Sequence, residues 1–172
     1  TSVTLNGVAV SEVTSATDEE IAVVVASGSA GTGDVIIVSN TGATVTVEDG
    51  FTYLTASEIE DLEPSSGQLG TIVTIGGSNM LGGGTSIESV SFGDISTTLI
   101  NASDAAIVVS VDASGTEDET GDVVVVADTG ATTTLADGYT SLAAGDVDSV
   151  VPASGVLLTA VHISGSNLLM GG

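Results

Sequence analysis

Short apolar runs separated by glycine and polar turns dominate the hydrophobic pattern of this chain. In the stretch 69–75, apolar and small polar residues alternate in a period of two. This alternation predicts a strand whose inward face carries Leu69, Thr71, Val73 and Ile75. The glycines and prolines on either side mark the turns that bound such strands.

Further strands are expected after this one. The pattern predicts them at 89–92, 97–100, 106–111, 122–127 and 131–137. The last two flank Asp128, Thr129 and Gly130, a sequence that fits a hairpin turn. About seven short strands in roughly 88 residues, with turn signals every ~8 to 12, are typical of an Ig-like sandwich. We therefore expect an all-β chain built from Ig-like β-sandwiches.

The run Val123 to Val126 is apolar on both faces of its predicted strand. Two interpretations are open. One side of the strand faces a neighbouring module instead of water, or the strand is simply rich in valine and half exposed.

The chain repeats itself with a period of about 88 residues. Shifting it by 88 places 58–84 on 146–172 with 13 identities in 27 pairs, and 33–54 on 121–142. The segment 2–8 matches 89–95 at a shift of 87. These matches predict three domain parts: residues 1–57 are the C-terminal part of a repeat, 58–145 a complete repeat, and 146–172 the N-terminal strands of a following one.

One motif of the complete repeat resembles the IPT/TIG domain, an Ig-like β-sandwich. It has the form P-x-x-G-x-x-G-T-x-V-x-I-x-G-x-N followed by V-x-F-G, and it comprises Pro64, Gly67, Gly70, Thr71, Val73, Ile75, Gly77, Asn79, Val90, Phe92 and Gly93. The other copies depart from it, with Leu158 in place of Gly70 and Leu5-Asn6 in place of Phe92-Gly93. The resemblance implies tandem domains at the cell surface or outside the cell, acting as spacers, adhesion modules or interaction surfaces.

Charge excludes several classes of partner. The chain has 23 Asp and Glu residues, one His and no Lys or Arg, so its formal net charge is −23. Without permanent cations it has no means to neutralise phosphates, so we expect no nucleic-acid partner and no binding to anionic membranes. No apolar run reaches the ~18 residues of a membrane span, so no membrane insertion is expected.

The candidate chemistry is sparse. His162, the only imidazole, aligns with Thr74 on the outward side of its strand and is expected to be an ordinary surface or interface residue. No pair of acids is placed to converge in a cleft, and the chain has no cysteine. We therefore expect no enzyme activity, no cofactor and no dedicated metal site.

Calcium is the one metal partner worth considering. The acidic loop 112–122 offers oxygen ligands, but its counterpart 26–34 keeps only Asp34, and the spacing fits no EF-hand. Acidic pairs also precede the two repeat-opening prolines, at Glu58 with Glu60 and at Asp146 with Asp148. Each pair is interpreted as a charged strand edge that discourages stray pairing; a bridging calcium is the alternative.

Modification by glycans is the other expectation. Asn101-Ala102-Ser103 is an N-glycosylation sequon between two predicted strands, and its use depends on a eukaryotic secretory source.

Two classes of function remain. The first is a structural module of an extracellular filament that binds copies of itself head to tail, in which 146–172 completes the sandwich begun by 1–57 of the next copy. The units are either separate subunits or segments of one long tandem chain, in which a short peptide linkage replaces the gap between them. Its expected interface places Val147, Leu157, Val161 and Ile163 against Val3 and Leu5, with Gly172 close to Thr1 of the neighbour. The second is an adhesin or receptor ectodomain that binds a carbohydrate or protein ligand.

Overall fold

The computed structural model describes residues 1–113, 115 and 118–169, and it is all-β over this range. The chain divides into two compact units, Thr1–Ala56 and Ser57–Gly172, which are described separately. The second unit contains a complete domain followed by a hairpin.

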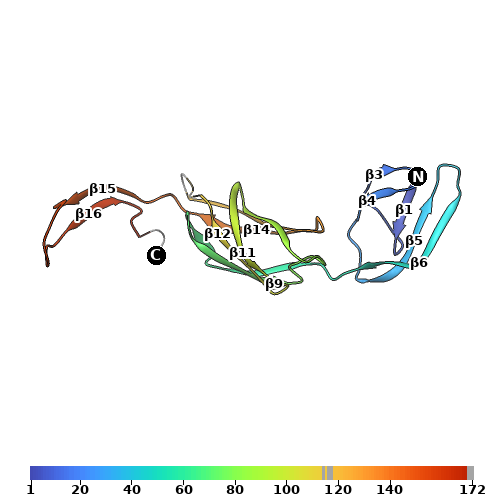
Figure 1. Cartoon of the computed structure of the whole chain (residues 1–172), viewed down its shortest axis with the longest axis horizontal. Helices are drawn as coiled ribbons and strands as arrows, with labels where there is room; N and C mark the ends of the chain where they lie inside the picture. Colours follow the sequence, from blue (N-terminus) through green and yellow to red (C-terminus); the bar gives the residue numbers. More distant parts are fainter. Residues whose placement is uncertain (114, 116–117, 170–172) are drawn as a thin grey trace. The chain divides into compact units, whose positions relative to one another are not determined.

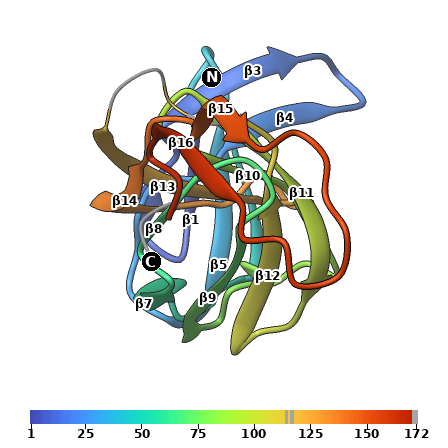
Figure 2. The ribbon, with the colours of Figure 1, turned by 90° about the vertical axis from the view of Figure 1, so that its left-hand side faces the viewer.

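The complete domain has eight strands in the order β7-β9-β12-β11-β10-β13-β14-β8. Figures 1 and 2 show β9, β12 and β11 side by side. All neighbours are antiparallel except β14 and β8. The strands are β7 (Glu58–Glu63), β8 (Ser66–Gly67), β9 (Ile72–Ser78), β10 (Ile87–Phe92), β11 (Ile95–Ala102), β12 (Ala106–Val111), β13 (Glu119–Ala127) and β14 (Thr132–Ser141).

Alternation along these strands builds one core, as the hydrophobic pattern predicts. Val73 and Ile75 in β9 are buried, whereas Ile72 and Thr74 between and beside them are exposed. The same cluster takes in side chains from both ends of the strand order, namely Ile59, Leu62, Met80, Val90, Phe92, Ile107, Val109, Val111, Val123, Val125 and Tyr139. Because strands from opposite ends of the order share one core, the sheet closes on itself as an Ig-like sandwich.

The valine-rich strand β13 is half exposed on its outer side. Val123 and Val125 point into the core, and Val124 and Val126 are half-buried. Serine and threonine residues lie opposite these two valines on β10 and β14. Both interpretations of the run stay predictions, because the half-exposed side of a single chain is compatible with either.

The inward face around residue 70 differs from the simple alternation. Leu69 is 63% exposed, and Gln68 is buried in its place. A turn separates them from β9: the Thr71 N–H donates to the Gln68 carbonyl at 3.0 Å, and Gly70 has a φ of +84°. Since the turn interrupts the period of two, the strand begins only at Ile72.

β-Bulges shift the inward positions in several strands. The pairing of β7 with β9 slips between Ile59 and Asp61, so that Ile59 and Leu62 both face the core although they are three residues apart. Glu58 and Glu60 are both exposed at this strand.

The first unit holds a four-stranded sheet in the order β2-β1-β5-β6 and a separate hairpin of β3 and β4. Val3, Leu5 and Tyr53 are buried in its small core. Ile21 and Val23 of the hairpin pack against this core and are half-buried. The strands are β1 (Ser2–Leu5), β2 (Val8–Ala9), β3 (Glu12–Ala16), β4 (Ile21–Val24), β5 (Gly31–Val38) and β6 (Thr44–Tyr53).

Local contacts recur 88 residues apart in the two units. The Asp34 carboxylate accepts a hydrogen bond from the Asp49 N–H at 3.0 Å, and Asp122 accepts one from Asp137 at 2.9 Å. The hydroxyls of Thr32 and Thr52 also lie 2.7 Å apart, and those of Thr120 and Thr140 lie 2.8 Å apart. The pair β5–β6 is therefore built like the pair β13–β14.

Candidate functional site

The final hairpin presents an apolar face to solvent. It consists of β15 (Asp146–Val151) and β16 (His162–Ser166), drawn in orange and red in Figure 1. We define the hairpin face as Val147, Val150, Val161, Ile163 and Leu168, whose side chains are between 36% and 58% exposed. For comparison, Ile and Val rank among the residues most often fully buried in folded proteins.

The hairpin repeats the strand pair β7–β9 residue for residue. Val147 lies opposite Gly165 and Val150 opposite Ile163, and the pairing slips between Val147 and Ser149. Subtracting 88 from each number gives the register of β7–β9, including its bulge. The five positions that match the hairpin face are Ile59, Leu62, Val73, Ile75 and Met80, all 9% exposed or less. The hairpin face therefore corresponds to the side of β7–β9 that forms the core of the complete domain.

The structure places the predicted interface residues differently. Val147, Val161 and Ile163 belong to the hairpin face, but Leu157 is 91% exposed and precedes β16 in a turn. Its counterpart Leu69 is also exposed. The sequence reasoning missed Val150, because the bulge that turns it inward breaks the period of two.

A second candidate surface lies in the first unit. The hairpin β3–β4 pairs Val13 with Val23 and Ala16 with Ile21, slipping between Val13 and Ser15. The pair β11–β12 has the same register and the same slip 86 residues later. Its turn also recurs, since the Thr17 hydroxyl bonds to Glu20 as the Ser103 hydroxyl bonds to Ala106.

One difference separates these two hairpins. In the complete domain β12 pairs with β11 on one side and β9 on the other, whereas among the described residues β4 pairs only with β3. Ile107 and Val109 of β12 are fully buried, but their counterparts Ile21 and Val23 are half-buried. Val3 and Leu5, predicted at the interface, are already buried in the unit's own core.

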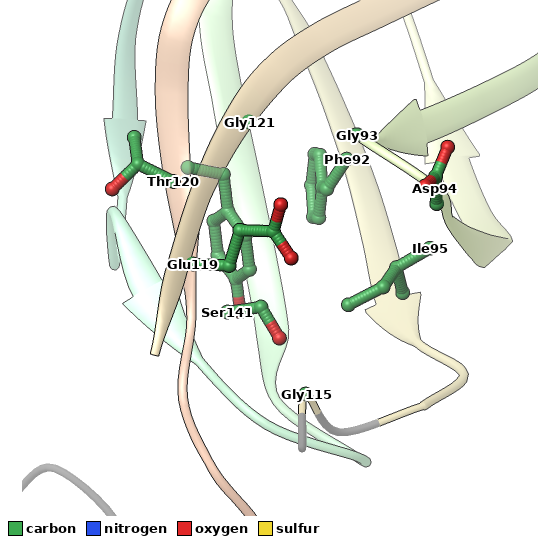
Figure 3. A pocket seen from close by; sticks show the side chains of 10 residues that line it. Phe92, Gly93, Asp94, Ile95, Gly115, Glu119, Thr120, Gly121 and Ser141 are labelled. Carbon is green, nitrogen blue, oxygen red and sulfur yellow. The ribbon is translucent and has the colours of Figure 1, made fainter. Parts of the chain in front are cut away.

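A small cavity of about 210 Å³ lies beside the aromatic pair of the domain. Phe92 stacks on Tyr139 with ring centroids 4.3 Å apart, and burial raises the pKa of Tyr139. Figure 3 shows the Glu119 carboxylate and the Ser141 hydroxyl at this cavity. No imidazole lines it, so it offers no nucleophile activated by a histidine base.

Acidic side chains near the loop 112–122 are used by the fold. Asp118 accepts a hydrogen bond from the Ala143 N–H at 2.9 Å, and Asp122 accepts the one from Asp137. Within the part of the chain that the structure describes, no group of three or more His, Asp or Glu residues is arranged to hold a metal. Ser114, Thr116 and Glu117 of this loop lie outside the described residues, so calcium there stays a prediction.

The remaining candidates are surface positions. Asn101 is exposed near the end of β11, opposite Val108, so the sequon lies partly within a strand and not between two strands as expected. His162 is exposed opposite Val151. Residues 170–172, including Gly172, lie outside the described residues. Within the described residues, no helix is long and apolar enough to cross a membrane.

Comparison with known proteins identifies the fold. The family model of the IPT/TIG domain matches residues 57–141. A search of curated proteins finds no match. Among solved structures, the full extracellular region of plexin A4 is similar over 98% of this chain, with 22% identity and a TM-score of 0.53. The chain spans 15% of that plexin chain.

A second solved structure is SGBP-B of the Bacteroides ovatus mixed-linkage glucan utilization locus, in complex with a mixed-linkage heptasaccharide. It is 14% identical with a TM-score of 0.39, over 85% of this chain and 39% of that one. The plexin likeness supports the Ig-like fold, and the weaker glucan-locus likeness carries no further argument.

Proposed function

We propose that this chain, whose residues 57–141 match the IPT/TIG domain model, is a structural module of an extracellular filament. Copies join head to tail, and the segment 146–172 of one copy completes the sandwich begun by residues 1–57 of the next. The observation that carries the proposal is the match between two incomplete parts. The hairpin face repeats the core side of β7–β9, and the first unit repeats the strands that β7–β9 cover.

Apolar burial contributes to this contact but is not sufficient by itself. Fully burying a large aliphatic side chain is worth about 1.5–3 kcal/mol, so burying the exposed half of five such side chains is worth roughly 5 kcal/mol. Association costs an estimated ~4 to 15 kcal/mol in lost freedom of motion, so apolar burial alone does not hold two copies together. Backbone pairing between strands has to contribute as well.

The charge of the chain suits an assembly based on apolar and backbone contacts. With 23 acids and no Lys or Arg, two copies have no salt bridge to exchange beyond the chain terminus and His162. Long-range repulsion is screened beyond a Debye length of about 8 Å at physiological ionic strength. Contacts that require no cation, such as strand addition, therefore remain available.

The alternative is an adhesin or receptor ectodomain that binds a carbohydrate or protein. Sugar-binding platforms normally expose aromatic rings. None of the four aromatic residues of this chain is exposed in that way: Tyr53, Phe92 and Tyr139 are buried, and Phe51 is half-buried beside Tyr53. This burial favours the filament over a sugar-binding platform.

A direct test examines the whole chain by light scattering and electron microscopy over a range of concentrations. We expect linear assemblies of variable length that shorten when a synthetic peptide of residues 146–172 is added, because the peptide occupies the acceptor site. A scrambled peptide of the same composition is the control. A chain that stays monomeric at physiological salt, with or without peptide, would exclude the filament.

A further inference from the structure

We infer that the acceptor is the edge of β4 that pairs with no strand among the described residues, and that the incoming segment 161–164 of a second copy pairs with it in a defined antiparallel register. Ile21 lies opposite Ile163, and Val23 lies opposite Val161. This inference rests on the proposed head-to-tail assembly and specifies the strand edge that makes it. The occupant is a second copy of this chain, because the chain's own hairpin face has the shape that the edge lacks.

The complete domain supplies the register. There β9 pairs with β12 so that Ile75 lies opposite Ile107, Thr74 opposite Val108 and Val73 opposite Val109. The strand β16 corresponds to β9 at a shift of 88, and β4 corresponds to β12 at a shift of 86. Applying both shifts gives the pairs Ile163 with Ile21, His162 with Ala22, and Val161 with Val23.

The turn between β3 and β4 of the acceptor supplies a second set of contacts. In the complete domain the Asp104 carbonyl accepts a hydrogen bond from the Met80 N–H at 3.1 Å, and its carboxylate accepts one from the Leu81 N–H at 3.2 Å. The turn of β3–β4 carries Asp18 at the position of Asp104. By the same shifts, the Asp18 carbonyl accepts a hydrogen bond from the Leu168 N–H and the Asp18 carboxylate accepts one from the Leu169 N–H. The second bond is charge-assisted and needs no cation.

Charge also selects this edge. The segments 21–24 and 160–164 contain no Asp or Glu, although acids make up 23 of the 172 residues. Like charges placed directly opposite each other destabilise a strand pair, so a strand ladder without acids is one that two highly negative copies tolerate. Among the other strands at a sheet end in this unit, β6 matches the side of β14 that pairs with only two residues of β8. It offers a much shorter ladder than β4.

Disulfide trapping tests the register, because the chain has no cysteine of its own. Chains carrying Ala22→Cys and an affinity tag are mixed with untagged chains carrying His162→Cys under mild oxidation. Residues opposite each other in an antiparallel pair lie within the distance that a disulfide spans. The matched control replaces Ala22→Cys with Val24→Cys, which is two positions out of register on the same strand face. Light scattering follows the assembly of each mixture.

We expect a tagged heterodimer with Ala22→Cys and its loss with Val24→Cys, in mixtures that assemble equally well. Assembly without the Ala22 heterodimer, or with the Val24 heterodimer in its place, would overturn the edge and register while leaving the filament intact. A disulfide only between two Ala22→Cys chains would show that two β4 edges pair with each other and would also overturn the inference. Absence of any assembly would overturn both the inference and the proposed function.

Discussion

Val150 lies opposite Ile163 in the antiparallel pair of β15 and β16, and both side chains are exposed although their counterparts Leu62 and Ile75 are buried in the complete domain. The same pair of apolar positions thus occurs once inside a core and once at a surface.

Replacing Ile163 with Asp is expected to abolish assembly. The new carboxylate would have to enter the apolar interior of the neighbouring sandwich, where an unpaired charge is strongly disfavoured. The domain 57–145 should keep its thermal midpoint, because Ile163 lies outside its core. Val151→Asp, which adds the same charge outside both the hairpin face and the segment 160–164, is the control and should still assemble. Equal assembly by the two variants would contradict the role of the hairpin face.

A matched pair of alanine variants distinguishes core from surface. Ile75→Ala should lower the free energy of unfolding of the domain by about 2–5 kcal/mol, because it leaves a cavity at a fully buried site. Ile163→Ala, the same change at the equivalent exposed position, should have little effect on unfolding of the isolated chain. Urea unfolding curves of dilute protein measure both, and a similar loss in the two variants would contradict this assignment.

Asp128 should make the domain sensitive to acid. Thr85 donates its N–H and its hydroxyl to this carboxylate, at 3.1 Å and 2.9 Å to Oδ2, and these bonds, together with Ser86, hold its pKa below the ordinary value of 3.8. A lowered folded-state pKa means that the contribution to stability is present above pH 3.8 and is lost as the pH falls through the folded-state pKa.

The measurement is the thermal midpoint between pH 2 and 6, run in parallel on the native chain and Asp128→Asn. We expect the Asn variant to be the less stable of the two at the upper end of this pH range and the difference to shrink on acidification. Thr85→Val, which removes one donor, should show a smaller change in the same direction. A difference that grows below pH 3.8 would contradict the assigned sign.

We expect Asn101 to be glycosylated when the chain is expressed in a eukaryotic secretory host. The exposed Asn101 should carry a glycan that an amidase removes, seen as a mass change in the intact chain. Ser103→Ala should abolish the modification, and Ser103→Thr should keep it because the hydroxyl that bonds to Ala106 is retained. Unmodified native chain from such a host would rule the site out.

Salt should stabilise the chain. The chain has 23 Asp and Glu residues and no Lys or Arg, and His162 is its only other ionisable side chain apart from tyrosine. The mutual repulsion of the carboxylates opposes the compact state, and added ions screen this repulsion. We expect the thermal midpoint to rise between about 10 mM and 1 M sodium chloride, with most of the rise at the low end, where the Debye length shortens fastest. A flat series would show that the carboxylates are too dispersed to matter.

Local patterns in the sequence determined the strands and turns of this protein and the IPT/TIG resemblance of residues 57–141. The alternation at Val73 and Ile75 predicts the core side of β9, and Asp128-Thr129-Gly130 predicts the hairpin of β13 and β14, where Gly130 has a φ of +80°. Such features are local, because burial of alternate side chains and the φ of a turn glycine depend on a few neighbouring residues.

Positions that depend on pairing between strands were decided only by the tertiary structure. A bulge brings Val150 onto the same face as Ile163, and a turn closed by Thr71 exposes Leu69 while it buries Gln68. Neither can be read from a period of two, since a bulge is defined by the partner strand that it slips against. The free edge of β4 is of the same kind: it is visible only because β12, its counterpart, has β9 beside it.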